Sequence, residues 1–148
     1  MNCHKWTIPL VLLALFCLPP LLATSGEAAE RPAGGEGKRV VAEVGEDGIQ
    51  RVEVVGGEYY FEPNHIVVRV NKPVELLVRK SGGFIPHNII VKAPEAGIDF
   101  NVGMEGEFKP IRFTPSKTGE YEMSCDKSFL WFESHREKGM KGIIEVVE

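Results

Sequence analysis

Short runs of alternating apolar and polar residues, separated by turn residues, constrain the fold of this chain more than any other feature. In the run at 65–71, Ile66, Val68 and Val70 fall on one face of an extended chain. Comparable runs lie at 40–44, 50–55, 74–79, 87–92, 110–113, 121–125 and 142–147. Glycine, proline and asparagine separate nearly all of these runs, and no long amphipathic helical pattern competes with them. The sequence therefore predicts an all-β domain of seven or eight short strands, a β-sandwich or barrel with Greek-key connections.

The segment at 93–107 departs from this pattern. It contains Pro94, Gly97, Gly103 and Gly106 among scattered apolar residues. Such a composition fits a long surface connection better than a strand.

The N-terminal part of the chain has the pattern of a secretory signal peptide. Lys5 precedes an apolar run at 8–23, which Pro19 and Pro20 interrupt, and small residues follow. The run is shorter than the roughly 20 apolar residues of a membrane-spanning helix. We therefore predict a cleaved signal at 1–29, with retention as an anchor as the alternative, and export to the periplasm or another extracytoplasmic space.

The remainder of the chain is predicted to form a tether and one domain. Residues 30–38 are rich in glycine and charge without periodicity, which is typical of a flexible tether. Residues 39–148 have the length of a single domain with one core. The net charge of −4 and the pI near 5.6 indicate no broad basic surface, so nucleic acid is not an expected partner.

Cleavage of the signal would leave Cys125 as the only thiol of the mature chain. A lone cysteine in an oxidising compartment favours a buried or metal-bound role over a disulfide. His135 and Met140 follow Cys125 on the same glycine-bounded segment, and His87 is able to supply a fourth ligand. Thiolate, imidazole and thioether suit copper better than hard cations, which prefer oxygen. Zinc remains an alternative for the cysteine and histidine ligands.

The strand periodicity predicts where two of these side chains point. Alternation at 121–125 puts Cys125 on the same face as Met123. The same count puts His87 on the face of Ile89. Both ligands are therefore expected to face the core.

The motifs YYFEPNHIVVRVNKPVELLV, PHNIIV, FTPSKTGEYEMSC and HREKGMKG resemble those of cupredoxins, the small blue-copper electron-transfer proteins. They are also similar to the cupredoxin-like domain of cytochrome c and quinol oxidase subunit II. The resemblance covers about residues 50–148 and implies that His87, Cys125, His135 and Met140 bind one copper ion, which cycles between Cu(I) and Cu(II). It also implies that Asn88 braces the cysteine loop by hydrogen bonding.

The resemblance implies an exported electron carrier rather than an enzyme, with redox proteins as partners, a respiratory oxidase among them. The sequence agrees in that it contains no obvious nucleophile and base pair or carboxylate dyad. The alternatives are a copper storage or delivery protein, an oxidase accessory module, and a metal-free β-sandwich that binds a partner. A dinuclear copper centre is disfavoured because the loop holds no second cysteine.

The loop departs from the usual cupredoxin pattern in its length. Nine residues, DKSFLWFES, separate Cys125 from His135. We expect a short helix here, with Asp126 as N-cap and Gly139 as its stop, whose N-terminus would favour the Cys125 thiolate.

Two further features of this insert have alternative interpretations. The apolar cluster is expected to close the end of the sandwich as core, and the alternative is an exposed patch that docks a redox partner. It comprises Phe129, Leu130, Trp131 and Phe132. Glu133 is able to replace Met140 as the axial ligand or to join the shell.

Overall fold

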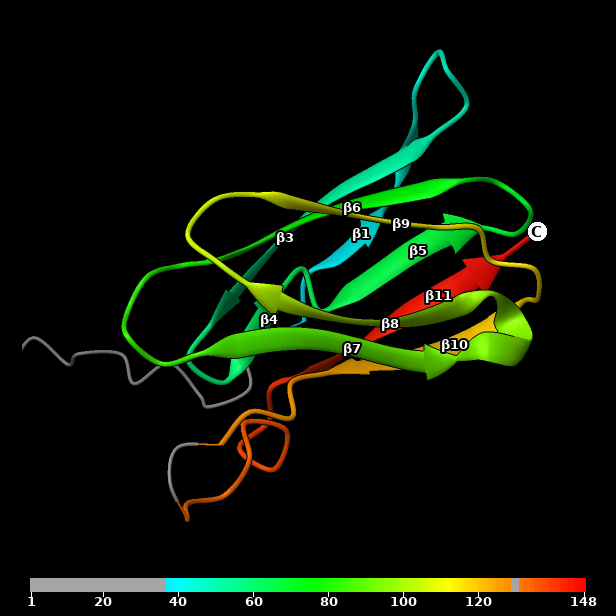
Figure 1. Cartoon of the computed structure of the whole chain (residues 1–148). Coiled ribbons are helices and arrows are strands. Elements are labelled where there is room, and N and C mark those ends of the chain that lie inside the picture. Colours follow the sequence, from blue (N-terminus) through cyan, green and yellow to red (C-terminus); the bar gives the residue numbers. More distant parts are fainter. Residues whose placement is uncertain (1–36, 129–130) are drawn as a thin grey trace, which may run out of the picture. The chain divides into compact units, whose positions relative to one another are not determined.

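Two mixed sheets make up the domain (Figure 1). The structure, a computed structural model, describes residues 37–128 and 131–148, all of which belong to one compact unit. The predicted signal at 1–29 and most of the predicted tether lie outside the described residues. Within the described ranges, no helix has the length and apolar character needed to cross a bilayer.

The larger sheet has six strands in the order β1-β5-β11-β10-β7-β8. The smaller sheet has five, in the order β2-β3-β6-β9 with β4 paired to β3. Their bounds are β1 Arg39–Val41, β2 Glu43–Val44, β3 Gln50–Gly57, β4 Tyr60–Glu62, β5 His65–Arg69, β6 Val74–Lys80, β7 His87–Ala93, β8 Ile98–Met104, β9 Lys109–Phe113, β10 Gly119–Ser124 and β11 Lys141–Val147.

The all-β prediction is confirmed, but the predicted number of strands was too low. The run at 40–44 forms two strands, because the chain crosses at Ala42 from β1, paired with β5, to β2, paired with β3 in the other sheet. Strand β4 was missed because it has only three residues.

The segment at 93–107 is also a strand rather than a long connection. A short 3-10 turn, η1 at Pro94–Ala96, ends at Gly97, whose positive φ of 71° closes the turn. The chain then forms β8, which pairs with β7 along its whole length in antiparallel register, from Ala93 opposite Ile98 to His87 opposite Met104. The polar residues and Gly103 obscured the alternation of apolar and polar residues along β8 in the sequence.

The core lies between the inward faces of the two sheets. On β3 and β6, Val54, Leu76 and Val78 are fully buried. On β7 and β11, Ile89 and Ile144 are fully buried as well. These side chains all belong to one hydrophobic cluster, which extends to the end of the sandwich where β7 begins and β10 ends.

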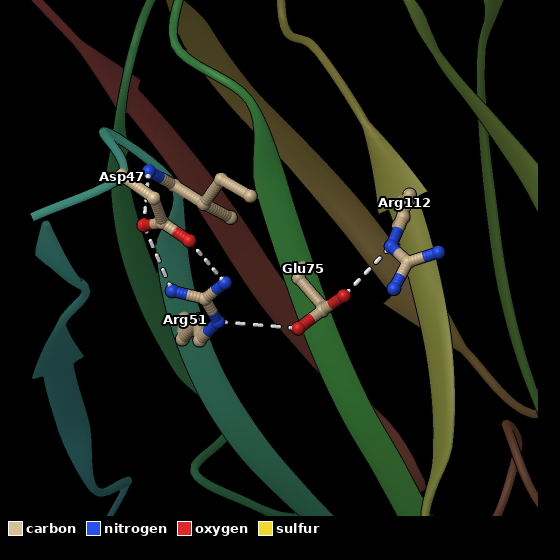
Figure 2. A network of polar contacts seen from close by, with 5 residues as sticks. Asp47, Arg51, Glu75 and Arg112 are labelled. Carbon is tan, nitrogen blue, oxygen red and sulfur yellow. Dashed lines mark hydrogen bonds and ion pairs between the residues drawn. The ribbon is translucent and has the colours of Figure 1, made fainter. Parts of the chain in front are cut away.

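A row of charged residues ties three strands of the smaller sheet together (Figure 2). Arg51 on β3, Glu75 on β6 and Arg112 on β9 are direct cross-strand neighbours. Glu75 accepts hydrogen bonds from Arg112 Nε at 2.7 Å and from Arg51 Nε at 3.2 Å. The hydrogen bonds from Arg112 and then Arg51 hold the pKa of Glu75 below its ordinary value. Asp47 binds the other side of the Arg51 guanidinium, which lowers the pKa of Asp47 to about 2.

Candidate metal centre

The sheet topology brings the four predicted ligands to one end of the sandwich. His87 is the first residue of β7, and Cys125 directly follows β10. His135 and Met140 precede β11. Because β10 is antiparallel to both β7 and β11, the end of β10 lies beside the starts of the other two strands. Residues that are 48 positions apart in sequence, His87 and His135, thereby become neighbours.

Three of these side chains form a tight cluster. Nδ1 of His87 and Nδ1 of His135 are 3.1 Å apart, and Sγ of Cys125 is 3.5 Å from Nδ1 of His135. One ligand atom from each of the three residues lies within 4.8 Å of the other two. Nitrogen and sulfur donors that share a metal sit about 2.0–2.3 Å from it, so at trigonal or tetrahedral angles they lie roughly 3–4 Å from one another. The cluster therefore has the donor types and the spacing that a single metal ion requires.

All three side chains are buried, with exposed fractions of 3% for His87, 0% for Cys125 and 1% for His135. Burial lowers the pKa of His87, and the neighbouring His135 and Lys80 act in the same direction. Burial also lowers the pKa of His135, with Lys138 adding to the effect. Both imidazoles are thus held in the neutral form that binds metal.

The thiol of Cys125 has its pKa raised by burial, although the Asn88 amide donates to Sγ over 3.4 Å. The predicted assistance of a helix N-terminus to the thiolate needs a helix directly after Cys125, and residues 126–128 form none. A metal that binds here has to displace the thiol proton.

Asn88 connects the start of β7 to the residue after Cys125. Its Nδ2 donates to Asp126 Oδ1 at 2.8 Å, and its Oδ1 accepts from the Asp126 amide at 3.2 Å. Nδ2 also donates to Asn101 Oδ1 at 2.8 Å. Asn88 is itself buried, so these bonds satisfy a polar group that would otherwise be costly to enclose. The geometry is that of a brace between β7, β8 and the cysteine loop.

The helix predicted between Cys125 and His135 is wrong for the described part of that loop, where residues 125–128 and 131–134 contain no helix. Asp126 bonds to Asn88 instead of capping a helix. A single turn occurs later: Ser134 and Glu137 exchange hydrogen bonds in the manner of a capping box. This turn ends at Gly139, whose φ is +98°. The turn keeps His135 close to Met140, whose amide donates to the His135 carbonyl at 2.8 Å.

The loop aromatic side chains do not close the core. Trp131 is 84% exposed and Phe132 is 54% exposed, so the prediction of a buried cluster is wrong for these two residues. Phe129 and Leu130 lie outside the described residues. Glu133 is also exposed, and it does not belong to the cluster of potential metal ligands.

Met140 is fully buried, and its carbonyl accepts a hydrogen bond from the Cys125 amide at 3.2 Å. Its methyl group reaches toward Gly56 on the opposite sheet, where Met104 also lies. Met104 has no predicted role, because the segment at 93–107 was expected to be a surface connection. The missed signal was the alternation Ile98, Phe100, Val102, Met104, which marks one face of β8.

Tyr59 is another neighbour of the site that no sequence pattern indicates. Its ring meets the His135 ring edge to face, with centroids 5.4 Å apart. Lys138 Nζ lies 4.7 Å from the centroid of the Tyr59 ring and donates to its hydroxyl at 3.2 Å. Tyr59 and Lys138 together cover one side of His135.

No family model matches the sequence, and no curated protein matches it. Among solved structures, the metal-binding domain of the Streptococcus pneumoniae Cu(I)-exporting P-type ATPase CopA, determined with Cu(I), is 30% identical, with a TM-score of 0.55. The match covers 77% of this chain and 100% of that domain. The chain belongs to the cupredoxin family.

Two further cupredoxin matches show the fold alone. Reduced auracyanin from the photosynthetic bacterium Roseiflexus castenholzii is 19% identical, with a TM-score of 0.54, and the match covers 72% of this chain and 99% of auracyanin. A chain of a heme-copper terminal oxidase dimer is 21% identical, with a TM-score of 0.53, and the match covers 74% of this cupredoxin and 72% of the oxidase chain. The predicted cupredoxin-type sandwich is thereby confirmed.

Proposed function

We propose that this cupredoxin binds one copper ion through His87, Cys125 and His135, with Met140 as a weaker fourth ligand, and that it carries electrons. The observation that carries the proposal is the buried cluster of two imidazole nitrogens and one sulfur at the spacing of a shared ion. Copper would supply a one-electron redox couple at this position. The thiolate and thioether favour copper over hard cations.

The surroundings of the cluster suit electron transfer. Two of the proposed ligands lie at the ends of paired strands. Asn88 holds the loop that carries the thiol in place by hydrogen bonding. A framework of this kind resists a change of ligand geometry when the metal changes charge, which keeps the energetic cost of reorganisation low. Exclusion of water by the buried ligands also prevents solvent from joining the shell. We propose a carrier rather than an enzyme, exported by the N-terminal signal.

The proposed partners are redox proteins, a respiratory oxidase among them. The exposed Trp131 and Phe132 lie on the same loop as Cys125 and His135, so a partner that packs on these aromatic rings would approach the metal. Phe84, fully exposed in the connection before His87, adds a further apolar side chain near this end.

Delivery or export of Cu(I) is the second candidate function. It is favoured by the 30% identity to a domain of a Cu(I)-exporting ATPase that was determined with Cu(I). In that role the same ligands would release the metal to an acceptor rather than retain it through oxidation and reduction.

The test of copper binding is spectroscopic. Cupric ion is added to the mature chain, and visible and electron paramagnetic resonance spectra are recorded for the wild type, Cys125→Ser and Ser124→Ala. We expect an intense thiolate-to-copper absorption band that the Cys125 variant loses and the Ser124 variant keeps, because Ser124 lies on the other face of β10. A colourless wild type that binds no copper at stoichiometric addition overturns the proposal.

Electrochemistry then separates the two candidate functions. A carrier is expected to show reversible one-electron voltammetry while it keeps its copper. A delivery protein is expected to transfer Cu(I) rapidly to a competing chelator and to bind cupric ion weakly. Stable copper without a reversible wave would contradict the carrier function.

A further inference from the structure

Gly56 has no side chain, and the side-chain end of Met140, a proposed ligand, packs directly against it. It is the last inward-facing position of β3, where Gln50, Val52, Val54 and Gly56 are buried in alternation. A Cβ atom at Gly56 would lie 2.8 Å from Sδ of Met104 and 3.2 Å from Cε of Met140. The ends of two methionine side chains, from different elements, therefore meet over this one glycine.

Met104 stands beside His87. The two residues are directly opposite each other in the β7–β8 ladder, and both are buried, with Met104 only 4% exposed. Residues opposite each other in an antiparallel pair share a face, and their Cβ atoms are about 5 Å apart. Met104 therefore lies between a cluster histidine on one side and the Met140 side chain on the other.

The chemistry of this placement differs from ordinary core packing. Leucine or isoleucine would fill the same volume with a better defined shape, whereas methionine brings a polarizable sulfur on an unbranched, flexible chain. A thioether is uncharged, so a second one adds a soft donor without adding charge to a buried site. Soft sulfur donors favour Cu(I).

We propose that Met104 is a second thioether of the copper site and that Gly56 provides the room for it. The site then offers Cu(I) three sulfur donors, from Cys125, Met140 and Met104. This inference rests on the proposed copper binding and extends it by naming a residue of β8 that selects the reduced ion.

The first test measures Cu(I) affinity under anaerobic conditions by competition with a chromophoric chelator. The variants are Met104→Leu, Met140→Leu and, as the matched control, Met123→Leu. Met123 is buried too, but its methyl group lies over Gly142 rather than Gly56. We expect Met104→Leu to weaken Cu(I) binding by about tenfold, with little change for Met123→Leu. Equal affinities for Met104→Leu and the wild type overturn the inference.

The second test substitutes none of the proposed ligand residues. Gly56 is not among the described glycines with positive φ, so alanine is compatible with its backbone. In Gly56→Ala the new methyl group has to displace the Met104 and Met140 side-chain ends, and we expect a loss of Cu(I) affinity similar to that of Met104→Leu. An unchanged Cu(I) affinity in Gly56→Ala contradicts the inference.

A direct readout comes from the methionine methyl groups in NMR spectra, labelled with carbon-13 and assigned by the three leucine variants. Addition of Cu(I) is expected to shift the Met104 and Met140 resonances and to leave Met123 nearly in place. A Met104 resonance that stays in place on saturation with Cu(I) overturns the inference. If the wild type binds copper in neither oxidation state, the proposed function itself fails, and this result is distinct from the failure of Met104 alone.

Discussion

At the scale of single residues, the geometry of the candidate site depends on groups that are not among the proposed ligands. Asn88 satisfies its buried amide with bonds to Asp126 and Asn101 and so joins the strand that carries His87 to the loop that carries Cys125. A loose Cys125 would bring its sulfur to the metal only part of the time. We therefore expect the affinity for copper to depend on Asn88 as well as on the proposed ligands.

Asn88→Ala is expected to weaken copper binding by about 10- to 100-fold. It should also lower the free energy of unfolding by about 1–3 kcal/mol, because the partners of the amide lose their bonds. Chelator competition and urea titration measure the two effects. Asn101→Ala is the control, since it removes one bond of Asn88 and leaves both bonds to Asp126. Equal copper affinity in the Asn88 variant and the wild type would contradict the bracing role.

At the scale of elements, the smaller sheet combines apolar packing on its inner face with a charged row on its outer face. Arg51, Glu75 and Arg112 continue this row across β3, β6 and β9, as Figure 2 shows. Strand β6 pairs in parallel with β3 and in antiparallel orientation with β9. Cross-strand pairs of opposite charge therefore favour one register of β6 against each of these two neighbours.

The charged row is expected to make the folded state less stable as the pH falls into the acid range. Because Arg112 and Arg51 lower the pKa of Glu75 from its ordinary 4.5, its stabilising contribution is present above that value. The contribution disappears as the pH falls through the lowered pKa. We expect Glu75→Gln to lower the melting temperature near neutral pH and to flatten its decline in acid. Thermal melts from about pH 7 to about pH 3 test this, with the exposed Glu53→Gln on β3 as control. Parallel curves for the wild type and Glu75→Gln would argue against it.

The loop between Cys125 and His135 carries the exposed aromatic rings, and their proposed role in docking a partner can be tested. Trp131→Ser removes an exposed ring, so the free energy of unfolding should change by no more than about 0.5 kcal/mol. Electron transfer from the reduced copper protein to a cytochrome c should slow by about fivefold, while the rate with hexacyanoferrate stays the same.

Val44→Ser is the matched control for Trp131→Ser. Val44 is likewise an exposed apolar residue, but it lies on β2 beside the start of β3, away from the metal-binding end. A cytochrome c rate that is unaffected by Trp131→Ser would show that the rings do not form the docking surface.

At the scale of the whole molecule, the centre draws on elements that are distant in sequence. The proposed ligands come from β7, the end of β10 and the turn before β11, while Gly56 of β3 faces one of them, Met140, from the other sheet. Unfolding separates these groups. Copper bound at this site would therefore prefer the native state to the unfolded chain, and its binding would add to the free energy of folding.

Cu(I) is expected to raise the melting temperature under anaerobic conditions. A free Cu(I) concentration one hundred times the dissociation constant corresponds to about 2.7 kcal/mol of added stability. Differential scanning calorimetry with increasing buffered Cu(I) measures the shift. In Cys125→Ser the shift should be much smaller, and an identical shift in this variant would place the bound copper elsewhere.

The sequence by itself determined the class of the fold and the direction of two ligand side chains. The alternation of apolar residues reports the pleat of each strand, so it predicted that Cys125 and His87 face the core, and both are buried. The spacing of His135 and Met140 on one short segment also indicated that they belong to one site. All of this information is local along the chain.

Only the tertiary structure decided which strands are neighbours and what surrounds the site. Periodicity describes the face of a strand but not its partner, so the pairing of His87 with Met104 was not visible in the sequence. The loop was mispredicted for a similar reason: Asp126 bonds to Asn88, 38 positions earlier in the chain, instead of capping a helix. Trp131 is exposed instead of joining the core. The contact of Met104 and Met140 with Gly56 arises because the two sheets face each other there. The pattern of a single strand does not report which residues of the other sheet it faces.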